Sequence, residues 1–263
     1  MTRTSLRGRH VAITGASSGL GEAVARELSR AGARVTLVAR RREQLERLAR
    51  ELPGESVVAA HDLSDPARAA DWITGAEAAL GPIDVLVSNA GFLTLGPVAS
   101  FDPGEGERMM QVNLLTPARL MRAVLPAMLA RGYGTIVNVT SVAAFVALPG
   151  WAYQAASKTG SATFSEALAA EVAGTGVHVM TAYPGMTDTP MTRAGLDAYR
   201  DRSLVSRLPL GDAAIFARRL RLAIERRQTR LVYPRFYALA RWFPRTASWF
   251  AGALVGRNFS AAG

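Results

Sequence analysis

A regular alternation of short apolar runs with longer amphipathic segments occupies roughly the first 190 residues, and it restricts the fold more than any other feature. The runs are rich in β-branched residues and predict strands at 10–14, 34–39, 56–60, 83–87, 134–140 and 177–182. The segments between them predict helices at 20–31, 42–52, 66–79, 105–131 and 153–173, followed by a helix at 212–227 and a strand at 230–233. This order predicts an α/β fold: a doubly wound parallel sheet of about seven strands with helices on both faces.

No feature of the sequence marks a boundary between domains. A length of 263 residues fits one large domain, and there is no internal repeat and no low-complexity linker. We therefore expect residues 1–235 to form a single domain and residues 236–263 to form a C-terminal extension of it. The loop at 184–209 is the longest stretch without clear periodicity, and we expect it to cover the substrate.

The residue types that the chain lacks exclude several kinds of chemistry. It has no cysteine, which excludes disulfides, thiolate nucleophiles and iron–sulfur clusters. His10, His61 and His178 are far apart in the sequence and show no metal-binding spacing, so no metal site is expected. No apolar run reaches the roughly 18 residues of a spanning helix, and the basic N-terminus lacks the core of a signal peptide. We expect a cytoplasmic protein.

A glycine-rich segment between the first strand and the first helix has the composition of a phosphate-binding loop. Glycines at this place permit a tight turn and let backbone N–H groups approach a pyrophosphate at the helix N-terminus. The candidate contacts are Gly15, Ser17, Ser18, Gly19, Leu20 and Gly21. Residues 15–19 of this segment also match the GxSxG pattern of α/β-hydrolases. We reject that interpretation because the hydrolase serine follows a later strand and no downstream histidine has a persuasive triad context.

The end of the second predicted strand indicates which dinucleotide binds. Sites for NAD carry a carboxylate here, which binds the ribose hydroxyls, whereas an arginine accommodates a 2′-phosphate. In this chain Ala39 takes the place of the acid and is followed by Arg40 and Arg41. We therefore expect NADP(H) as cofactor. In the alternative interpretation Arg40–Arg42 only begin a solvated helix.

These motifs, and others that follow in order, resemble the short-chain dehydrogenase/reductase family, which consists of single-domain Rossmann enzymes. The resemblance extends over roughly residues 8–235. It implies cofactor contacts in three segments that follow predicted strands: Asp62-Leu63, Asn89-Ala90-Gly91, and Pro184-Gly185 with Thr187 and Thr189.

The resemblance also implies catalytic roles for three residues. Asn113 is similar to the asparagine that holds a water of the proton relay, and Ser141 is similar to the serine that polarises the substrate. Lys158 matches the family's catalytic lysine, which also holds the nicotinamide ribose and serves as a cofactor contact. It is the only lysine among the 31 basic residues.

The sequence departs from the family where the catalytic tyrosine is expected. That tyrosine lies 13 residues after the serine and four before the lysine, and both counts lead to Gln154. Tyr153 precedes it by one place. Residues four apart share a helix face and residues five apart do not, so a regular helix places Lys158 beside Gln154. Only a distorted first turn brings Tyr153 to the lysine.

Three hypotheses about the reaction stay open, because a glutamine amide donates a hydrogen bond but has no pKa suited to proton transfer. The first is an oxidoreductase with a substitute acid: Tyr153, a relay water or the substrate itself. The second is a non-redox enzyme of the same fold that catalyses cyclisation, isomerisation or elimination. The third is a catalytically silent NADP(H)-binding homologue, with a natural glutamine or one introduced experimentally. The apolar loop and tail favour a lipophilic carbonyl compound or alcohol as substrate.

The net charge of +10 is concentrated at the C-terminal end of the chain. Residues 215–263 contain ten arginines and one acid, Glu225, together with nine aromatic residues. This composition is typical of a segment at a membrane interface, so residues 236–263 are expected either to contact an anionic membrane surface or to pack on the substrate loop or a partner subunit. We expect no nucleic acid, because no recognition motif accompanies the charge.

The resemblance implies an oligomer, since family members are dimers or tetramers joined through two long helices. The matching segments here are 105–131 and 153–173, and their apolar faces are compatible with a homodimer or homotetramer. Packing inside one subunit would use the same residues.

Overall fold

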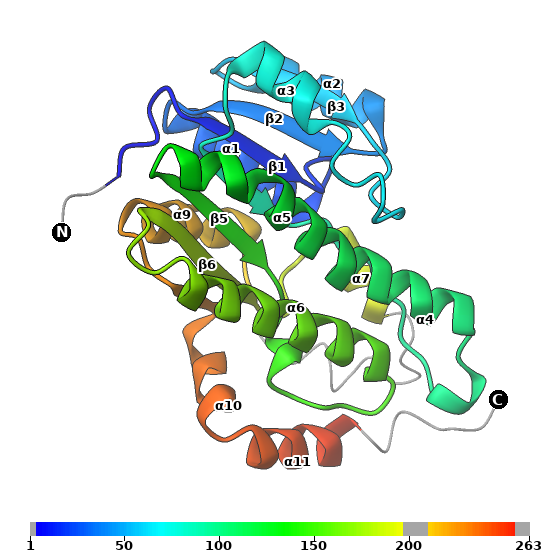
Figure 1. The fold of residues 1–263 in the computed structure, drawn as a ribbon. Helices are drawn as coiled ribbons and strands as arrows, with labels where there is room; N and C mark the ends of the chain where they lie inside the picture. The colour runs from blue at the N-terminus through cyan, green and yellow to red at the C-terminus, as the bar shows by residue number, and fades with distance from the viewer. Residues whose placement is uncertain (1–3, 197–209, 256–263) are drawn as a thin grey trace.

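The computed structural model describes residues 4–196 and 210–255, and its core is one parallel sheet of seven strands (Figure 1). The strands lie side by side in the order β3-β2-β1-β4-β5-β6-β7. The predicted α/β fold is confirmed. Their bounds are β1 His10–Thr14, β2 Arg34–Ala39, β3 Ser56–Ala60, β4 Val85–Ser88, β5 Gly134–Val139, β6 Val177–Pro184 and β7 Arg230–Tyr233.

Helices cover both faces of the sheet. One apolar core includes buried side chains of α1, α2 and α9, and the other includes those of α3, α5 and α6. Figure 1 shows α5 and α6 in front of the sheet, with α1 and α9 behind it. Their bounds are α1 Gly19–Arg30, α2 Arg42–Glu51, α3 Ile73–Leu80, α4 Pro103–Met110, α5 Thr116–Ala130, α6 Ala152–Glu171 and α9 Ala213–Glu225.

The strand order reverses direction between β1 and β4. The chain builds β1, β2 and β3 outward on one side, then returns to place β4 on the other side of β1. The loops that follow β1 and β4 therefore diverge and leave a crevice at the carboxyl edge of the sheet, which is where open α/β sheets bind their ligands.

The segment expected as one helix at 105–131 consists of three parts. A π-helical turn, η2 (Gln111–Leu115), joins α4 to α5 without a break in the chain direction. A π turn holds one more residue than an α turn, and the apolar pattern of the sequence continues across it. Such turns occur frequently at functional sites, and this one contains Asn113.

The helix expected at 66–79 begins later, at Ile73. Its first part is a series of turns, in which Oδ1 of Asp65 accepts a hydrogen bond of 2.9 Å from the backbone N–H of Ala67. The Asp-Pro pair at 65–66 therefore caps a turn and not the helix, because side-chain capping of this kind suits both structures.

Among the described residues, three α-helices and one 3₁₀ turn lie in segments after β6 and β7 for which no helix is predicted. Strand β6 continues to Pro184, and α7 (Pro190–Leu196) follows within the loop expected at 184–209. The remainder of that loop, 197–209, lies outside the described residues. After β7 the chain forms η4 (Arg235–Tyr237), α10 (Ala238–Trp242) and α11 (Pro244–Val255). No helix among residues 4–196 and 210–255 is long and apolar enough to cross a membrane.

Candidate active site

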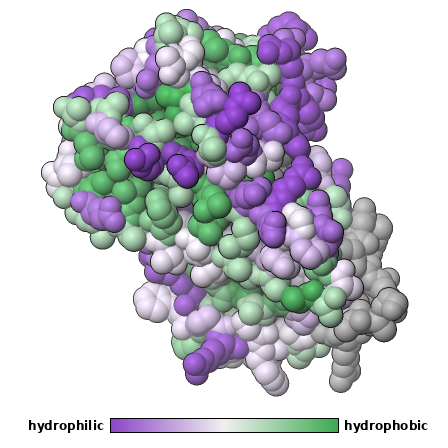
Figure 2. Space-filling view, turned by 45° about the vertical axis from the view of Figure 1, so that its right-hand side comes forward, coloured by the Kyte–Doolittle hydropathy of each residue, from purple (hydrophilic) through white to green (hydrophobic). Residues whose placement is uncertain are grey.

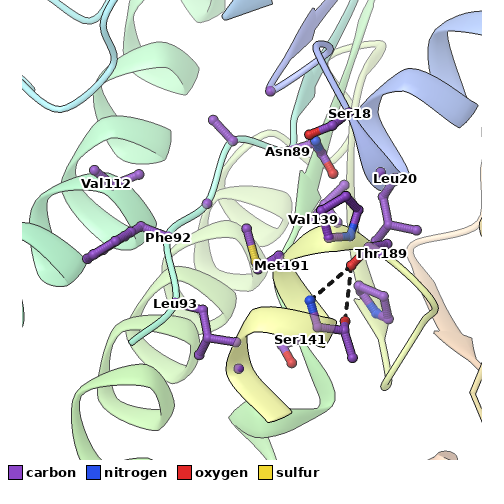
Figure 3. Close-up of a pocket in the computed structure, with 18 of the residues that line it drawn as sticks. Ser18, Leu20, Asn89, Phe92, Leu93, Val112, Val139, Ser141, Thr189 and Met191 are labelled. Atoms are coloured by element: carbon purple, nitrogen blue, oxygen red, sulfur yellow. Dashed lines mark hydrogen bonds between the residues drawn. The ribbon is translucent and has the colours of Figure 1, made fainter. Parts of the chain in front are cut away.

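A cavity of about 330 Å³ opens at the carboxyl edge of the sheet. Residues of the glycine-rich turn after β1 and of the loops after the next five strands line it, together with residues of α6 and α7. Figure 3 shows Ser18 and Asn89 near one end of this space and Ser141 near the other. The cavity thus connects the predicted phosphate loop with the predicted catalytic residues.

The turn after β1 depends on glycines for its shape. Gly15 has a φ of +69° and Gly19 a φ of +59°, the left-handed region that favours glycine. A methyl group at Gly15 would lie 2.9 Å from Cα of Ala90, so the loop after β4 fits against bare backbone. Gly21 does not line the cavity. A methyl group there would overlap the carbonyl oxygen of Gly15, so Gly21 lets α1 pack closely on the turn.

Hydrogen bonds join the ends of β1 and β4 beneath the cavity. The backbone N–H groups of Asn89 and Ala90 both donate to Oγ1 of Thr14, at 2.9 and 3.0 Å. Nδ2 of Asn89 donates to the carbonyl oxygen of Thr14 at 3.0 Å. The Asn-Ala-Gly segment therefore fixes the distance between the two loops that form the crevice.

Arg41 lies across the rim of the phosphate loop. Its Nε and Nη2 donate to Oγ of Ser17 at 3.2 and 2.9 Å, and Nη2 also donates to Oγ of Ser18 at 2.7 Å. Arg40 lines the same part of the cavity, and Ala39 supplies no carboxylate. Two guanidinium groups and two hydroxyls thus border this end of the cavity.

The loop after β3 contributes Asp62 and Leu63. Partial burial disfavours the charged form of Asp62, but hydrogen bonds from Ser64 and the charge of Arg40 outweigh it and hold the carboxyl pKa below its usual value. Oγ1 of Thr116, at the start of α5, donates to the carbonyl oxygen of Leu63 at 2.8 Å. The loop is therefore attached to the helix layer of that face.

Asn113 in the π turn is fully buried and holds three parts of the site together. Its Oδ1 accepts a hydrogen bond of 2.8 Å from the backbone N–H of Phe92. Its Nδ2 donates to the carbonyl oxygen of Phe92 at 2.9 Å, to Oε1 of Gln154 at 3.1 Å and to Oγ of Ser157 at 3.3 Å. Asn113 does not line the cavity but lies behind residues that do.

These contacts determine the orientation of the Gln154 amide. The backbone N–H of Phe92 is a donor only, so Asn113 must present its oxygen to it and its nitrogen to Gln154. Gln154 therefore presents Oε1 to Asn113, and its Nε2 has no hydrogen-bond partner among the described residues. Because Gln154 lines the cavity, this NH₂ group can donate to a ligand oxygen.

Lys158 lies one helical turn after Gln154 and lines the same cavity. The side chain is buried, and burial lowers the pKa of its ammonium group to about 8. No described residue forms an ion pair or a hydrogen bond with Nζ. A methyl group at Gly91 would lie 3.5 Å from Nζ, which places the amine against the loop after β4.

Tyr153 points away from the cavity. Its ring stacks on Phe101 with a centroid distance of 5.0 Å, and a methyl group at Gly106 of α4 would lie 2.5 Å from the ring. Helix α6 is regular from Ala152, so its first turn does not bring Tyr153 toward Lys158. The structure therefore gives Tyr153 a packing contact with α4 and no place among the reacting groups.

Ser141 lies two residues after β5 and caps the N-terminus of the 3₁₀ turn η3 (Val142–Ala144). Its Oγ accepts a hydrogen bond of 3.1 Å from the backbone N–H of Ala143. A hydroxyl that accepts in this way can still donate its hydrogen, and Ser141 lines the cavity. Ser141 and Gln154 thus provide two donors toward one space.

A row of buried hydrogen bonds holds α6 on the sheet and so determines where Gln154 and Lys158 lie. Nδ2 of Asn138 in β5 donates to the carbonyl oxygen and Oγ of Ser161, at 2.9 and 3.0 Å, and to Oγ of Ser165 at 3.1 Å. The Oγ atom of Ser165 lies 2.9 Å from Oγ1 of Thr181 in β6. Helix α6 is therefore tied to two neighbouring strands.

The last residue of β6 and the segment after it line the cavity through Pro184, Gly185, Thr187 and Thr189. Oγ1 of Thr189 accepts from the backbone N–H of Thr192 at 3.2 Å, and this threonine packs against Gly19. The ring of Tyr237 covers Gly185 where a side chain would otherwise lie.

An apolar wall at the reaction end was missed by the sequence analysis. Phe92 and Leu93 follow β4, and Met191 belongs to α7 (Figure 3). Trp151 and Val142 also line the cavity. A methyl group at Gly195 of α7 would lie 2.8 Å from Leu93, so the helix packs directly against this loop. The apolar residues directly after the Asn-Ala-Gly motif are the sequence feature that could have predicted this wall.

The structure brings most of the predicted site residues to one cavity. Among the described residues no cluster of His, Asp and Glu side chains could hold a metal ion. Gly21, Asn113 and Tyr153 lie outside the lining. The predicted residues that line it are Gly15, Ser17, Ser18, Gly19, Leu20, Arg40, Arg41, Asp62, Leu63, Asn89, Ala90, Gly91, Ser141, Gln154, Lys158, Pro184, Gly185, Thr187 and Thr189.

Comparison with known sequences identifies relatives along most of the chain. The family model described as short chain dehydrogenase matches residues 9–199. A short chain dehydrogenase of Pseudocercospora fijiensis is 38% identical over 192 residues, which cover 71% of this chain and 62% of the fungal protein. An uncharacterized oxidoreductase of Staphylococcus epidermidis is 32% identical over 205 residues, which cover 78% of this chain and 88% of that protein. The chain thus spans less than two thirds of the fungal relative.

Solved structures show the same architecture. A short-chain dehydrogenase from Streptomyces avermitilis superposes with a TM-score of 0.79 at 30% identity, covering 89% of this chain and 91% of that one. A metagenomic short-chain oxidoreductase, solved in complex with NADP, superposes with a TM-score of 0.73 at 33% identity. The superposition covers 87% of this chain and 98% of the metagenomic protein.

Proposed function

The chain belongs to the short-chain dehydrogenase family, and from that premise we propose that it is an NADP(H)-dependent oxidoreductase of lipophilic carbonyl compounds or the corresponding alcohols. The observation that carries the proposal is the cavity itself. It joins a phosphate loop bordered by Arg41 to a reaction end that contains Ser141, Gln154 and Lys158.

The residues present fit an NADP(H) molecule. The turn at Gly15 and Gly19 leaves bare backbone where a pyrophosphate needs close approach. Arg41 and the hydroxyls of Ser17 and Ser18 supply donors for a 2′-phosphate, and no acid at residue 39 repels it. When bound, the nicotinamide donates or accepts the hydride. One solved relative was crystallised with NADP, which supports the same choice here.

The reaction end suits a carbonyl group on an apolar molecule. Ser141 and the Nε2 group of Gln154 can both donate hydrogen bonds to one oxygen, which favours the negative charge that develops there during reduction. Phe92, Leu93 and Met191 provide apolar surface for the remainder of the substrate.

Lys158 is the proton source in this proposal. Gln154 has no proton to transfer, and Tyr153 lies outside the cavity. The carbonyl carbon would receive a hydride from the bound nicotinamide, and the carbonyl oxygen, which gains the π electrons, would take a proton from the Lys158 ammonium. Solvent then returns a proton to the amine. With a pKa of about 8, Lys158 is close to the value that suits an acid at neutral pH.

The experiment that tests the proposal measures NADPH oxidation with a panel of lipophilic ketones for the protein, for Lys158→Arg and for Gln154→Tyr. We expect turnover by the protein and a rate about 10²–10⁴ lower for Lys158→Arg, because arginine keeps the charge but does not release its proton. The rate of the protein should fall as pH rises through about 8.

Two results would contradict the proposed function. Turnover by Gln154→Tyr alone would show that residue 154 must be an acid and that the protein does not transfer hydride as it stands. NADPH binding without oxidation in all three would favour a non-redox reaction, in which Ser141 and the Gln154 amide stabilise an oxyanion, or a catalytically silent protein.

A further inference from the structure

The segment that follows the last strand turns large apolar side chains outward. From Arg235 to Trp249 it forms η4, α10 and the first part of α11, and we call this segment the tail surface. Its exposed apolar residues are Phe236 (48%), Leu239 (66%), Trp242 (76%), Phe243 (64%) and Trp249 (67%). Four of these five are aromatic.

The half-buried residues of the same segment are small, apart from Tyr237 and Arg241. Ala238, Ala240, Ala247 and Ser248 are half-buried. Oγ of Ser248 accepts a hydrogen bond of 3.0 Å from the backbone N–H of Ala147, and Tyr237 packs on Gly185. A helix held only by its own packing would bury the large residues and expose the small ones. The tail surface has the reverse arrangement, which indicates that something else covers its aromatic residues.

The charge of the tail surface is positive throughout. Residues 226–263 contain no acid. Within the described part of the chain, Arg235, Arg241 and Arg245 form no close ion pair. Burial raises the pKa of Glu166, but hydrogen bonds from Tyr183 and Arg230, with a smaller contribution from the charge of Arg241, hold that pKa below its usual value. Figure 2 shows pale and hydrophobic residues with scattered hydrophilic side chains along the lower end of the molecule, where α10 and α11 lie in Figure 1.

We propose that the tail surface docks on an anionic lipid membrane. Trp and Phe side chains prefer the boundary between headgroups and acyl chains, and arginines beside them bind lipid phosphates. A second copy of the chain fits less well, because a two-fold interface would bring each arginine cluster against its own copy. Through Tyr237 the tail surface also adjoins Gly185 at the cavity, so a lipophilic substrate could pass from the bilayer to the site.

The test is co-sedimentation of the full chain with vesicles of phosphatidylcholine, with and without one third phosphatidylserine. Binding should require phosphatidylserine. The double variant Arg235→Gln/Arg245→Gln should bind about 30-fold more weakly, since each arginine near an anionic surface contributes a factor of about five. Trp242→Ser/Phe243→Ser should lose binding by about 10-fold or more.

Matched variants control for charge and apolarity elsewhere. Arg47→Gln/Arg50→Gln removes two exposed charges from α2, and Ile215→Ser removes an exposed apolar side chain (50%) from α9; both should bind as the unmodified protein does. NADPH binding by every variant shows that it is folded, and the vesicle measurement requires no turnover, so it stands apart from the proposed reaction.

Three outcomes would overturn the proposal. One is equal sedimentation with both vesicle types. Another is full vesicle binding by Trp242→Ser/Phe243→Ser. The third is a change of oligomeric mass in that variant without a change in vesicle binding, which would assign the tail surface to a second copy of the chain.

Discussion

The two ends of the cavity are built in different ways. The end near β1 is shaped mainly by backbone: Gly15 and Gly19 form the turn, and the Arg41 side chain lies across its rim. The reaction end uses side chains from separate elements: Ser141 after β5 and Gln154 on α6. Substitutions of the turn glycines should therefore affect binding of any dinucleotide. Substitutions at the reaction end should change the chemistry and leave the cofactor in place.

The largest expected effect is at the end near β1. Gly15→Val should weaken NADPH binding by more than about 100-fold, since the new side chain strains a φ of +69° and collides with Ala90. Fluorescence titration with NADPH measures this. Gly8→Ala is the control, because Gly8 has a φ of +71° and nothing within 4 Å. It should lose stability but no affinity, and equal losses of affinity in both variants would contradict the prediction.

The second effect concerns the buried charge at the reaction end. The folded-state pKa of Lys158 is about 8, below the usual 10.5, so the unfolded chain binds more protons between these values. Its burial therefore destabilises the fold fully below pH 8, and the destabilisation is relieved as pH rises from 8 toward 10.5.

The lowered pKa corresponds to a destabilisation of the folded state by about 3 kcal/mol at neutral pH. Lys158→Met should raise the free energy of unfolding by that order at pH 7, and the difference from the unmodified protein should shrink toward pH 10.5. Urea unfolding at several pH values measures it. A constant difference across this range would show that the ammonium is not desolvated.

The third effect sharpens the role of the arginines. Arg41→Ala should lower affinity for NADPH by about 10–100-fold and leave affinity for NADH nearly unchanged, because charge-assisted bonds to a 2′-phosphate are lost. Arg42→Ala serves as the control, since Arg42 is exposed and lies 3.7 Å from Glu46. Equal losses for both dinucleotides would assign Arg41 to the turn and not to the phosphate.

The smallest effect is expected at Tyr153. Tyr153→Phe removes a hydroxyl that does not line the cavity and keeps the ring that stacks on Phe101. Turnover should stay within a factor of about two, and stability should change by no more than about 0.5 kcal/mol. A loss of activity as large as that of Lys158→Arg would identify Tyr153 as an acid and contradict the orientation described for α6.

The sequence predicts the strands and the glycine-rich turn beside the cavity well because both depend on local patterns. Strands buried on both faces appear as continuous apolar runs, and each starts or ends within two residues of its prediction. The glycine turn and Arg41 lie within one β–α–β unit, so their order in the sequence is also their order in space.

What the sequence misses depends on three-dimensional context. Asn113 in the π turn forms hydrogen bonds with Phe92 and Gln154, which come from distant segments, and no local pattern in the sequence marks the turn. Helix α7 is too short to show a helical period. The orientation of the Gln154 amide follows from a backbone N–H that no sequence pattern specifies.

The hydrogen bonds from Asn138 to Ser161 and Ser165 have a consequence for how this site can evolve or be engineered. Hydrogen bonds are directional, whereas an apolar interface tolerates small sliding movements. A one-residue slip of α6 would turn these serines about 100° away from β5 and leave the Asn138 amide buried without partners. New activities must therefore arise by exchange of side chains on a stationary helix. Residues 153–158 can be treated as a replaceable set whose positions are known in advance.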